Sequence, residues 1–177
     1  GKTLKWYELI PLLSYILLRG RCGKCKTHIS LQYPIVELWM GLVFASLYSV
    51  FGLTIYYLLL TIVFSIYTVI LIYDIRHKII PDLLVYLAIG LSLLVPLFLI
   101  PYSLINWLTG PILFTAFGFI WLVSRGRALG FGDAKLVLSI GLLLGAPQGF
   151  SAIALAFWIG TAVTLPIMLF SRKGITM

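Results

Sequence analysis

The sequence predicts an all-α protein, a polytopic transmembrane helix bundle of about six spans preceded by a small N-terminal cytoplasmic segment. Three observations support this fold class. Of the 177 residues, 62% are hydrophobic and 10% are charged, and the mean hydropathy is +1.11, a composition that no soluble domain of this size carries. The apolar residues form continuous runs rather than the alternating pattern of a membrane barrel. The basic residues fall only in alternate connections between those runs.

The expected spans are the apolar runs long enough to cross a bilayer, which takes about 17–25 helical residues. The fifth run is short, and we expect it to tilt or to begin earlier. Neighbouring spans are joined by short loops and should pack antiparallel. The runs cover residues 36–52, 54–73, 81–100, 104–123, 133–146 and 148–170.

The placement of the 13 Lys and Arg residues predicts the orientation of the bundle. They lie within 2–26, 76–78, 125–135 and 172–173, whereas the turns around 51–52, 101–103 and 145–148 carry no charge. This is the positive-inside pattern, so the basic connections are predicted to face the cytoplasm. The net charge of +8 then reflects topology and attraction to anionic lipid. We therefore expect membrane lipid as a partner, and no nucleic acid.

The N-terminal part of the chain is its one substantial polar segment. We predict a cytoplasmic cysteine-containing segment over residues 1–35 and a transmembrane core over 36–177. Cys22 and Cys25 form a Cys-x-x-Cys pair, which supplies half of a tetrahedral zinc site, and His28 is a candidate third ligand. A disulfide is disfavoured, because cytoplasmic thiols are kept reduced.

Only five acidic residues occur, and the predicted topology puts all of them near the cytoplasmic face. Asp74 ends the second expected span and Asp133 opens the fifth. An ionisable group at membrane depth is a functional candidate by default. The structural alternative is that Asp74 is a counter-ion for the neighbouring basic residues and that Asp133 stabilises its helix N-terminus through the helix dipole.

Two carboxylates in a low-dielectric site can share one proton, so that one is ionised and the other protonated. A hydrolase needs one group in each of these states. The ionised member takes a proton from a water that attacks the scissile carbonyl, while the protonated member polarises the carbonyl oxygen and then protonates the leaving amine. Because the pair titrates as a unit, neither Asp74 nor Asp133 is assigned the acid or the base role.

The surroundings of Asp133 favour the functional interpretation. Gly130 and Gly132 precede it in a Gly-x-Gly-Asp motif, and glycines let the backbone approach a substrate strand or a partner carboxylate closely. The motif alone is weak evidence. It becomes specific together with an Asp-x6-Pro-Asp stretch that begins at Asp74, on the same predicted face of the membrane.

Two further polar residues are candidates for supporting roles. Asp82 follows a proline, and an acid there is favoured at a helix start for structural reasons. Lys135 lies two residues after Asp133, where it either lowers the pKa of the pair, contacts substrate backbone or simply snorkels to the interface.

These motifs resemble those of the type IV prepilin leader peptidase family. The second catalytic aspartate of that family lies in a GxGD motif followed by Lys-Leu, as at residues 130–136, and the first precedes an (Ile/Leu)-Pro-Asp element, as at 74–82. The resemblance thus implies Asp74 and Asp133 as the catalytic pair. The segments 10–15, 18–22 and 33–37 also look like the cytoplasmic segment of the family.

The resemblance implies an aspartic endopeptidase of the bacterial cytoplasmic (inner) membrane, with its active site on the cytoplasmic side. Such enzymes cut the basic leader of type IV pilins and of type II secretion pseudopilins after a Gly. No cofactor is implied for cleavage, and S-adenosylmethionine is implied for members that also N-methylate the new N-terminal residue. The family usually has a second cysteine pair and further segments at both ends, so we expect this sequence to be a piece of a longer protein.

The main alternative is a small proton- or cation-coupled membrane carrier that uses the same aspartates. Carriers keep ionisable groups near the middle of the membrane, whereas every charge here maps to one face. A purely structural membrane scaffold is the second alternative, and it gives no reason for the two aspartate motifs to occur together.

Overall fold

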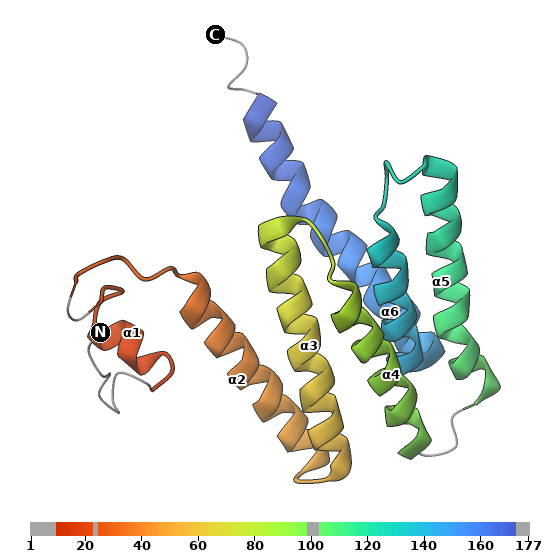
Figure 1. The fold of residues 1–177 in the computed structure, drawn as a ribbon, viewed down its shortest axis with the longest axis horizontal. Helices are drawn as coiled ribbons and strands as arrows, with labels where there is room; N and C mark the ends of the chain where they lie inside the picture. The colour runs from red at the N-terminus through yellow and green to blue at the C-terminus, as the bar shows by residue number, and fades with distance from the viewer. Residues whose placement is uncertain (1–9, 23–24, 99–102, 173–177) are drawn as a thin grey trace. The chain divides into compact units, whose positions relative to one another are not determined.

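A computed structural model describes residues 10–22, 25–98 and 103–172. Within these ranges the secondary structure is helical, apart from turns and an isolated antiparallel bridge between Arg21 and His28. The predicted all-α class is confirmed. In chain order the helices shown in Figure 1 are α1 (Leu13–Leu17), α2 (Gln32–Phe51), α3 (Ile55–His77), α4 (Asp82–Phe98), α5 (Leu104–Ser124) and α6 (Phe131–Arg172).

The expected spans coincide with apolar helices. Four stretches are long and apolar enough to cross a membrane: Gln32–Phe51, Ile55–His77, Leu104–Ser124 and Phe131–Pro166. Helix α4 is apolar but shorter, over Asp82–Leu97. The end of the third expected span, at residues 99–100, lies outside the described residues.

Helix α6 contains both the fifth and the sixth expected spans. Its backbone leaves the helical region at Gly145, where φ is 72° and ψ is −172°, a combination that is open essentially to glycine alone. A Cβ atom placed on Gly149 would lie 3.5 Å from the Cα atom of Gly141, whereas eight residues of continuous helix span about 12 Å. The chain therefore reverses at Gly145 (Figure 1). We call residues 131–144 the first arm of α6 and residues 146–172 its second arm.

The chain divides into two compact units, residues 1–68 and 69–177, with the division inside α3. In the first unit, neither α1 nor α2 contains a buried residue. Polar contacts link its parts: the Glu37 carboxylate accepts a hydrogen bond from the Leu12 amide at 2.8 Å, and the Trp39 indole donates to the Thr68 hydroxyl at 3.3 Å. The predicted division into 1–35 and 36–177 stays a prediction.

In the second unit, the first arm of α6 is the buried centre. Both α4 and α5 pack against α6. On the α4 side, the fully buried hydroxyl groups of Ser92 and Ser139 share a hydrogen bond of 3.0 Å. On the α5 side, a Cβ atom on Gly141 would lie only 2.7 Å from the Cα atom of Gly110, so the two backbones touch. Small residues permit such contacts between helices in lipid.

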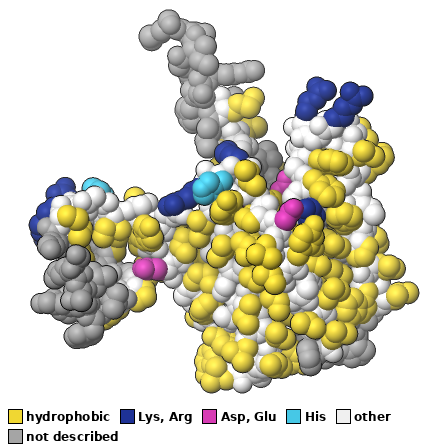
Figure 2. All heavy atoms as spheres, viewed as in Figure 1, with side chains coloured by type: hydrophobic (Ala, Val, Ile, Leu, Met, Phe, Trp, Pro, Cys, Tyr) yellow, Lys and Arg dark blue, Asp and Glu magenta, His cyan; other side chains and the backbone are white. Residues whose placement is uncertain are grey.

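The charged side chains that the structure describes in the second unit gather at one end. This end holds the α3–α4 and α5–α6 connections, and in Figure 2 its basic and acidic side chains stand above a surface that is otherwise largely hydrophobic. Large apolar side chains such as Leu97 and Phe119 are more than half exposed along the helices, as expected for lipid-facing positions. The basic residues described at this end are Arg76, Lys78, Arg125, Arg127 and Lys135.

Candidate active site

The site lies where two connections of the second unit meet. Asp74 is in the last turn of α3, and Asp82 is the first residue of α4, just after Pro81. Asp133 lies in the first turn of α6. The side chains of Asp74 and Asp133 are half-buried, whereas Asp82 is exposed. The reversal of α6 and the packing of α4 on its first arm bring these helix ends to the same end of the unit.

Asp133 has a structural role that can be seen directly. Its Oδ2 atom accepts a hydrogen bond from the Gly130 amide at 3.0 Å, and its own amide donates to the Gly130 carbonyl at 3.2 Å. This is the carboxylate half of a capping box, in which the third helical residue reaches back to the N-cap amide. The Oδ1 atom accepts no hydrogen bond from any residue that the structure describes. Capping therefore occupies one oxygen of Asp133 and orients the side chain.

Gly132 brings the motif against the preceding connection. A Cβ atom on Gly132 would lie 2.9 Å from the Cβ atom of Ile80, closer than real Cβ atoms approach. A Cβ atom on Gly130 would lie 3.2 Å from Oδ2 of Asp133. Both glycines are thus closely approached, Gly132 by Ile80 and Gly130 by the carboxylate of Asp133 itself. The predicted approach to a substrate strand or to the partner carboxylate stays a prediction.

The predicted site residues line one cavity of about 480 Å³ at this end of the unit. Asp74 and Asp133 both line this cavity. The structure therefore brings all six predicted peptidase-site residues together, while their chemical roles stay predictions. The cavity is lined by Asp74, Lys78, Ile79, Ile80, Asp82, Gly130, Phe131, Gly132, Asp133 and Lys135.

Lys135 forms an ion pair with Asp82. The Lys135 Nζ atom lies 2.5 Å from Oδ1 of Asp82, and it also lies 5.2 Å from the ring centroids of Tyr86 and Phe131. The Lys135 side chain is 13% exposed and that of Asp82 is 61% exposed. The pair ties the start of α4 to the start of α6.

Sequence reasoning did not single out Ile80 or Tyr86, which contact predicted site residues, nor Lys78, Ile79 and Phe131, which also line the cavity. Tyr86 follows Asp82 by four residues, a spacing that places both on one face of a helix, so its position next to Lys135 had a local signal. Ile80 had none beyond its place before Pro81, because its contact with Gly132 joins segments distant in sequence.

The predicted zinc site in the first unit is not supported. Cys22 and Cys25 are free thiols, and His28 is paired through its backbone with Arg21. Within residues 10–22, 25–98 and 103–172, no three His, Cys, Asp or Glu side chains converge as metal ligands. Two thiols do not complete the four-ligand shell of structural zinc. Thr27 donates its hydroxyl hydrogen to the Cys25 sulfur at 3.2 Å. This bond, together with hydrogen bonds from the Thr27 backbone and from Cys22, lowers the pKa of the Cys25 thiol to about 7.

Comparison with known families agrees with this geometry. The model of the type IV leader peptidase family matches residues 59–165, which contain both aspartate motifs. The chain belongs to the type IV leader peptidase family. Residues 1–51 match a second model, the bacterial peptidase A24 N-terminal domain. The apolar helices and the family together identify an integral membrane protein.

Curated relatives extend the match over most of the chain. A protein of Myxococcus xanthus is 34% identical over 149 residues, which are 81% of this chain and 44% of the relative. A protein of Pseudomonas putida is 31% identical, covering 92% of this chain and 57% of the relative, and one of Vibrio cholerae is 31% identical, covering 98% and 73%. All three are named prepilin leader peptidase/N-methyltransferase.

The chain spans about half the length of the first two of these relatives. No solved structure matches it. The carrier alternative is not supported, because the family and these relatives are peptidases by name.

Proposed function

We propose that this chain carries the peptidase centre of a prepilin leader peptidase. Its substrates are type IV prepilins or pseudopilins, whose basic leader is cut after a Gly at the cytoplasmic face of the bacterial inner membrane. Asp74 and Asp133 are the catalytic aspartates. The observation that carries the proposal is that these half-buried carboxyl groups, from the ends of α3 and α6, line one cavity together with the Gly-x-Gly-Asp turn.

During cleavage, one carboxyl group of the pair accepts a proton while the other donates one. One carboxylate takes a proton from water as the water oxygen attacks the scissile carbonyl carbon, and the other carboxyl donates a proton to the carbonyl oxygen. When the tetrahedral intermediate collapses, the C–N bond breaks, the leaving amine takes a proton from one carboxyl, and the other carboxylate takes back the proton from a hydroxyl of the intermediate, so the pair again holds one proton. Because the two groups line one cavity, we assign the acid and base roles to the pair rather than to either residue.

The surrounding residues position the pair. The Gly130 amide fixes Oδ2 of Asp133, so that Oδ1 is the oxygen left for a substrate or water. The contact between Gly132 and Ile80 sets the distance between the two connections. The ion pair of Lys135 with Asp82 supports the same junction from the α4 side, so we place both residues outside the chemical step.

A second activity, methylation of the new N-terminal residue with S-adenosylmethionine, is favoured by the names of the relatives. Those names attach it to proteins longer than this chain, and no residue described here is assigned to it. Zinc plays no part in the proposal, and membrane lipid is the expected surrounding of the apolar helices.

The test is cleavage of a model prepilin, with a basic leader that ends in Gly followed by Phe, by the full-length protein in detergent. We expect Asp74→Asn and Asp133→Asn each to lose at least about 10²- to 10⁴-fold in rate, the usual contribution of a general acid or base. The matched control is Asp82→Asn, which removes an acid from the same cavity and should stay within about tenfold of the parent.

Thermal unfolding of each variant shows whether it is folded, and mass spectrometry locates the cut. An Asp74→Asn or Asp133→Asn protein that cleaves at the parental rate disproves the catalytic pair. A folded parent that leaves every such prepilin intact disproves the function itself. An added mass of 14 Da, the size of a methylene group, on the product in the presence of S-adenosylmethionine would establish methylation.

A further inference from the structure

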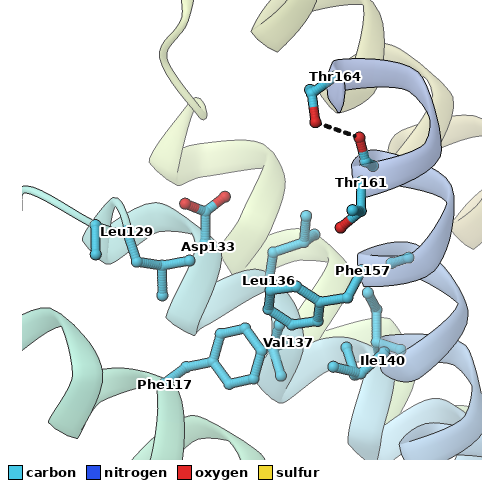
Figure 3. A pocket seen from close by; sticks show the side chains of 13 residues that line it. Phe117, Leu129, Asp133, Leu136, Val137, Ile140, Phe157, Thr161 and Thr164 are labelled. Carbon is cyan, nitrogen blue, oxygen red and sulfur yellow. Dashed lines mark hydrogen bonds between the residues drawn. The ribbon is translucent and has the colours of Figure 1, made fainter. Parts of the chain in front are cut away.

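Two cavities outside the aspartate cavity differ in the chemistry of their lining. In the second unit, a groove of about 660 Å³ lies along both arms of α6 and is lined mostly by apolar side chains such as Phe117 and Ile140, with Asp133 among them (Figure 3). In the first unit, a cavity of about 590 Å³ lies at the end of α1, and three of its six lining residues are cations. We call it the basic pocket. It is lined by Leu17, Leu18, Arg19, Arg21, Cys22 and Lys26.

The basic pocket gathers positive charge without a counter-ion. The side chains of Arg19, Arg21 and Lys26 are exposed, and none of them forms an ion pair with an acidic residue that the structure describes. Like charges held together repel each other, and an anion between them relieves that repulsion. Arginine also matches the oxygens of a phosphate group in a bidentate geometry. The lining therefore favours an anionic group, and a phosphate in particular.

Helix α1 carries an apolar face beside this pocket. Leu13, Ile16 and Leu17 are 44%, 69% and 62% exposed, and their spacing of three and four residues puts them on one side of the helix. Leu17 also lines the basic pocket, so the apolar face and the cations adjoin. An exposed apolar face bordered by cations is typical of a helix that lies in the plane of a membrane interface.

Contacts within the first unit place α1 beside the start of a candidate membrane span. The Glu37 carboxylate, in the second turn of α2, accepts the hydrogen bond from the Leu12 amide at 2.8 Å. Ser14 and Tyr15 line a small cavity of about 220 Å³ together with Tyr33 and Glu37, so this side of α1 faces α2. The apolar face of α1 is on the other side. Helix α1 thus lies level with the first turns of α2, where a spanning helix crosses the headgroup region.

We propose that α1 and the loop after it bind flat on the cytoplasmic leaflet of the membrane, with the headgroup phosphate of an anionic lipid in the basic pocket. Leu13, Ile16 and Leu17 then lie at the boundary between the headgroups and the acyl chains. Lipid is favoured over a free anion, because a free phosphate would fill the pocket and leave the adjoining apolar face in water. One lipid surface satisfies both features at once.

The test measures whether the apolar face of α1 touches lipid. An environment-sensitive fluorescent amino acid replaces Ile16 in the full-length protein, which is reconstituted into vesicles of lipids with brominated acyl chains, since bromine quenches fluorescence on contact. We expect strong quenching in phosphatidylcholine with about one third phosphatidylglycerol, and little in phosphatidylcholine alone. The same probe at Ser14, about 200° around the helix from Ile16, should be quenched less in both kinds of vesicle.

The chain offers a matched control for the charges. Residues 19–21 and residues 125–127 both read Arg-Gly-Arg, and in both turns the first arginine has φ 51° and the glycine has a positive φ. Arg19→Gln with Arg21→Gln should shift the equilibrium of the probe at 16 by about 30-fold away from lipid. Arg125→Gln with Arg127→Gln removes the same charge from the same kind of turn, and it should leave the quenching at 16 unchanged.

Three results would overturn the proposal. The probe at 16 could stay unquenched in both kinds of vesicle, as it would if the pocket held only a free anion or if another part of the protein covered α1. It could be quenched equally with and without phosphatidylglycerol, in which case the headgroup charge has no role. The two arginine pairs could have equal effects, which would show that the charge acts through the whole protein and not through the basic pocket. The measurement needs no cleavage, so its outcome is independent of the proposed peptidase function.

Discussion

The candidate active site and the cysteine loop at residues 20–29 both contain a glycine-bearing turn, yet these turns are held in different ways. In the second unit, the turn at 130–133 is fixed by contacts with residues about fifty positions away, through Gly132 on Ile80 and Lys135 with Asp82. In the first unit, the loop at 20–29 is closed by neighbours: the Cys22 amide donates to the Thr27 carbonyl at 2.9 Å, and the Ile29 amide to the Gly20 carbonyl at 2.8 Å.

The difference follows from what each turn is attached to. The first arm of α6 is buried, with Ala134 and Ser139 at 0% exposure, so the motif before it is anchored in a packed core. Neither α1 nor α2, the helices on either side of the cysteine loop, has a buried residue. Interior packing tolerates little change in volume, whereas exposed turns tolerate most substitutions. The aspartate turn has local capping hydrogen bonds and is also anchored by tertiary packing, whereas the hydrogen bonds that close the cysteine loop join near neighbours in the chain.

The largest effect is expected from adding one methyl group at Gly132, which tests whether tertiary packing holds the aspartate turn. The Ala side chain in Gly132→Ala would overlap Ile80, so we expect a loss of about 1–3 kcal/mol in unfolding free energy from overpacking. We also expect a fall in prepilin cleavage of about 10- to 100-fold, because the two connections would be displaced. Thermal unfolding and initial cleavage rates measure the two effects.

The control for that substitution is Gly90→Ala, whose added methyl group meets no neighbour and should leave cleavage unchanged. Replacing Ile80 by Gly removes the overlapping Cβ atom, so the double variant should lose less than the sum of the two single losses. Additive losses would show that the contact does not hold the site.

A smaller effect is expected at the Lys135–Asp82 pair. Lys135→Met keeps the aliphatic stem but removes the charge, and Asp82 is mostly exposed, so the pair should contribute about 0–1 kcal/mol to stability. Cleavage should fall by less than about tenfold, and Asp82→Asn combined with Lys135→Met should be no worse than either alone. If Lys135→Met abolishes cleavage while the protein stays folded, Lys135 belongs to the chemical machinery.

The smallest effect on cleavage is expected in the cysteine loop, where the measurement is chemical. Hydrogen bonds from the Thr27 hydroxyl, from the Thr27 backbone and from Cys22 lower the pKa of Cys25 to about 7, so the thiolate fraction of Cys25 rises as pH rises through that value. Site-resolved mass spectrometry after iodoacetamide treatment should give a rate profile for Cys25 with a midpoint near pH 7. Thr27→Val should move the midpoint upward, and alkylation should leave cleavage unchanged. A midpoint near the ordinary thiol value of about 8.5 would show that the loop is not formed in solution.

The helices and the turn at 145–148 could be predicted from the sequence because they follow from local properties. Continuous apolar runs require helices in lipid, and charge-free connections alternate with basic ones. The alternation of basic and charge-free connections also predicted that Asp74 and Asp133 lie at the same end of the bundle. The zinc prediction was not supported, because spacing identifies two ligands of a metal site but says nothing of where the others lie.

The sequence by itself thus determined the all-α class, the approximate spans and the aspartates to examine, since hydropathy, charge order and short motifs act over neighbouring residues. Only the tertiary structure decided that Ile80 is the neighbour of Gly132, that Lys135 pairs with Asp82 and that Asp133 lines both a polar cavity and an apolar groove. The physical reason is that these contacts join segments far apart in the chain. Which segments meet depends on how buried helix surfaces fit together, and no local pattern records that fit.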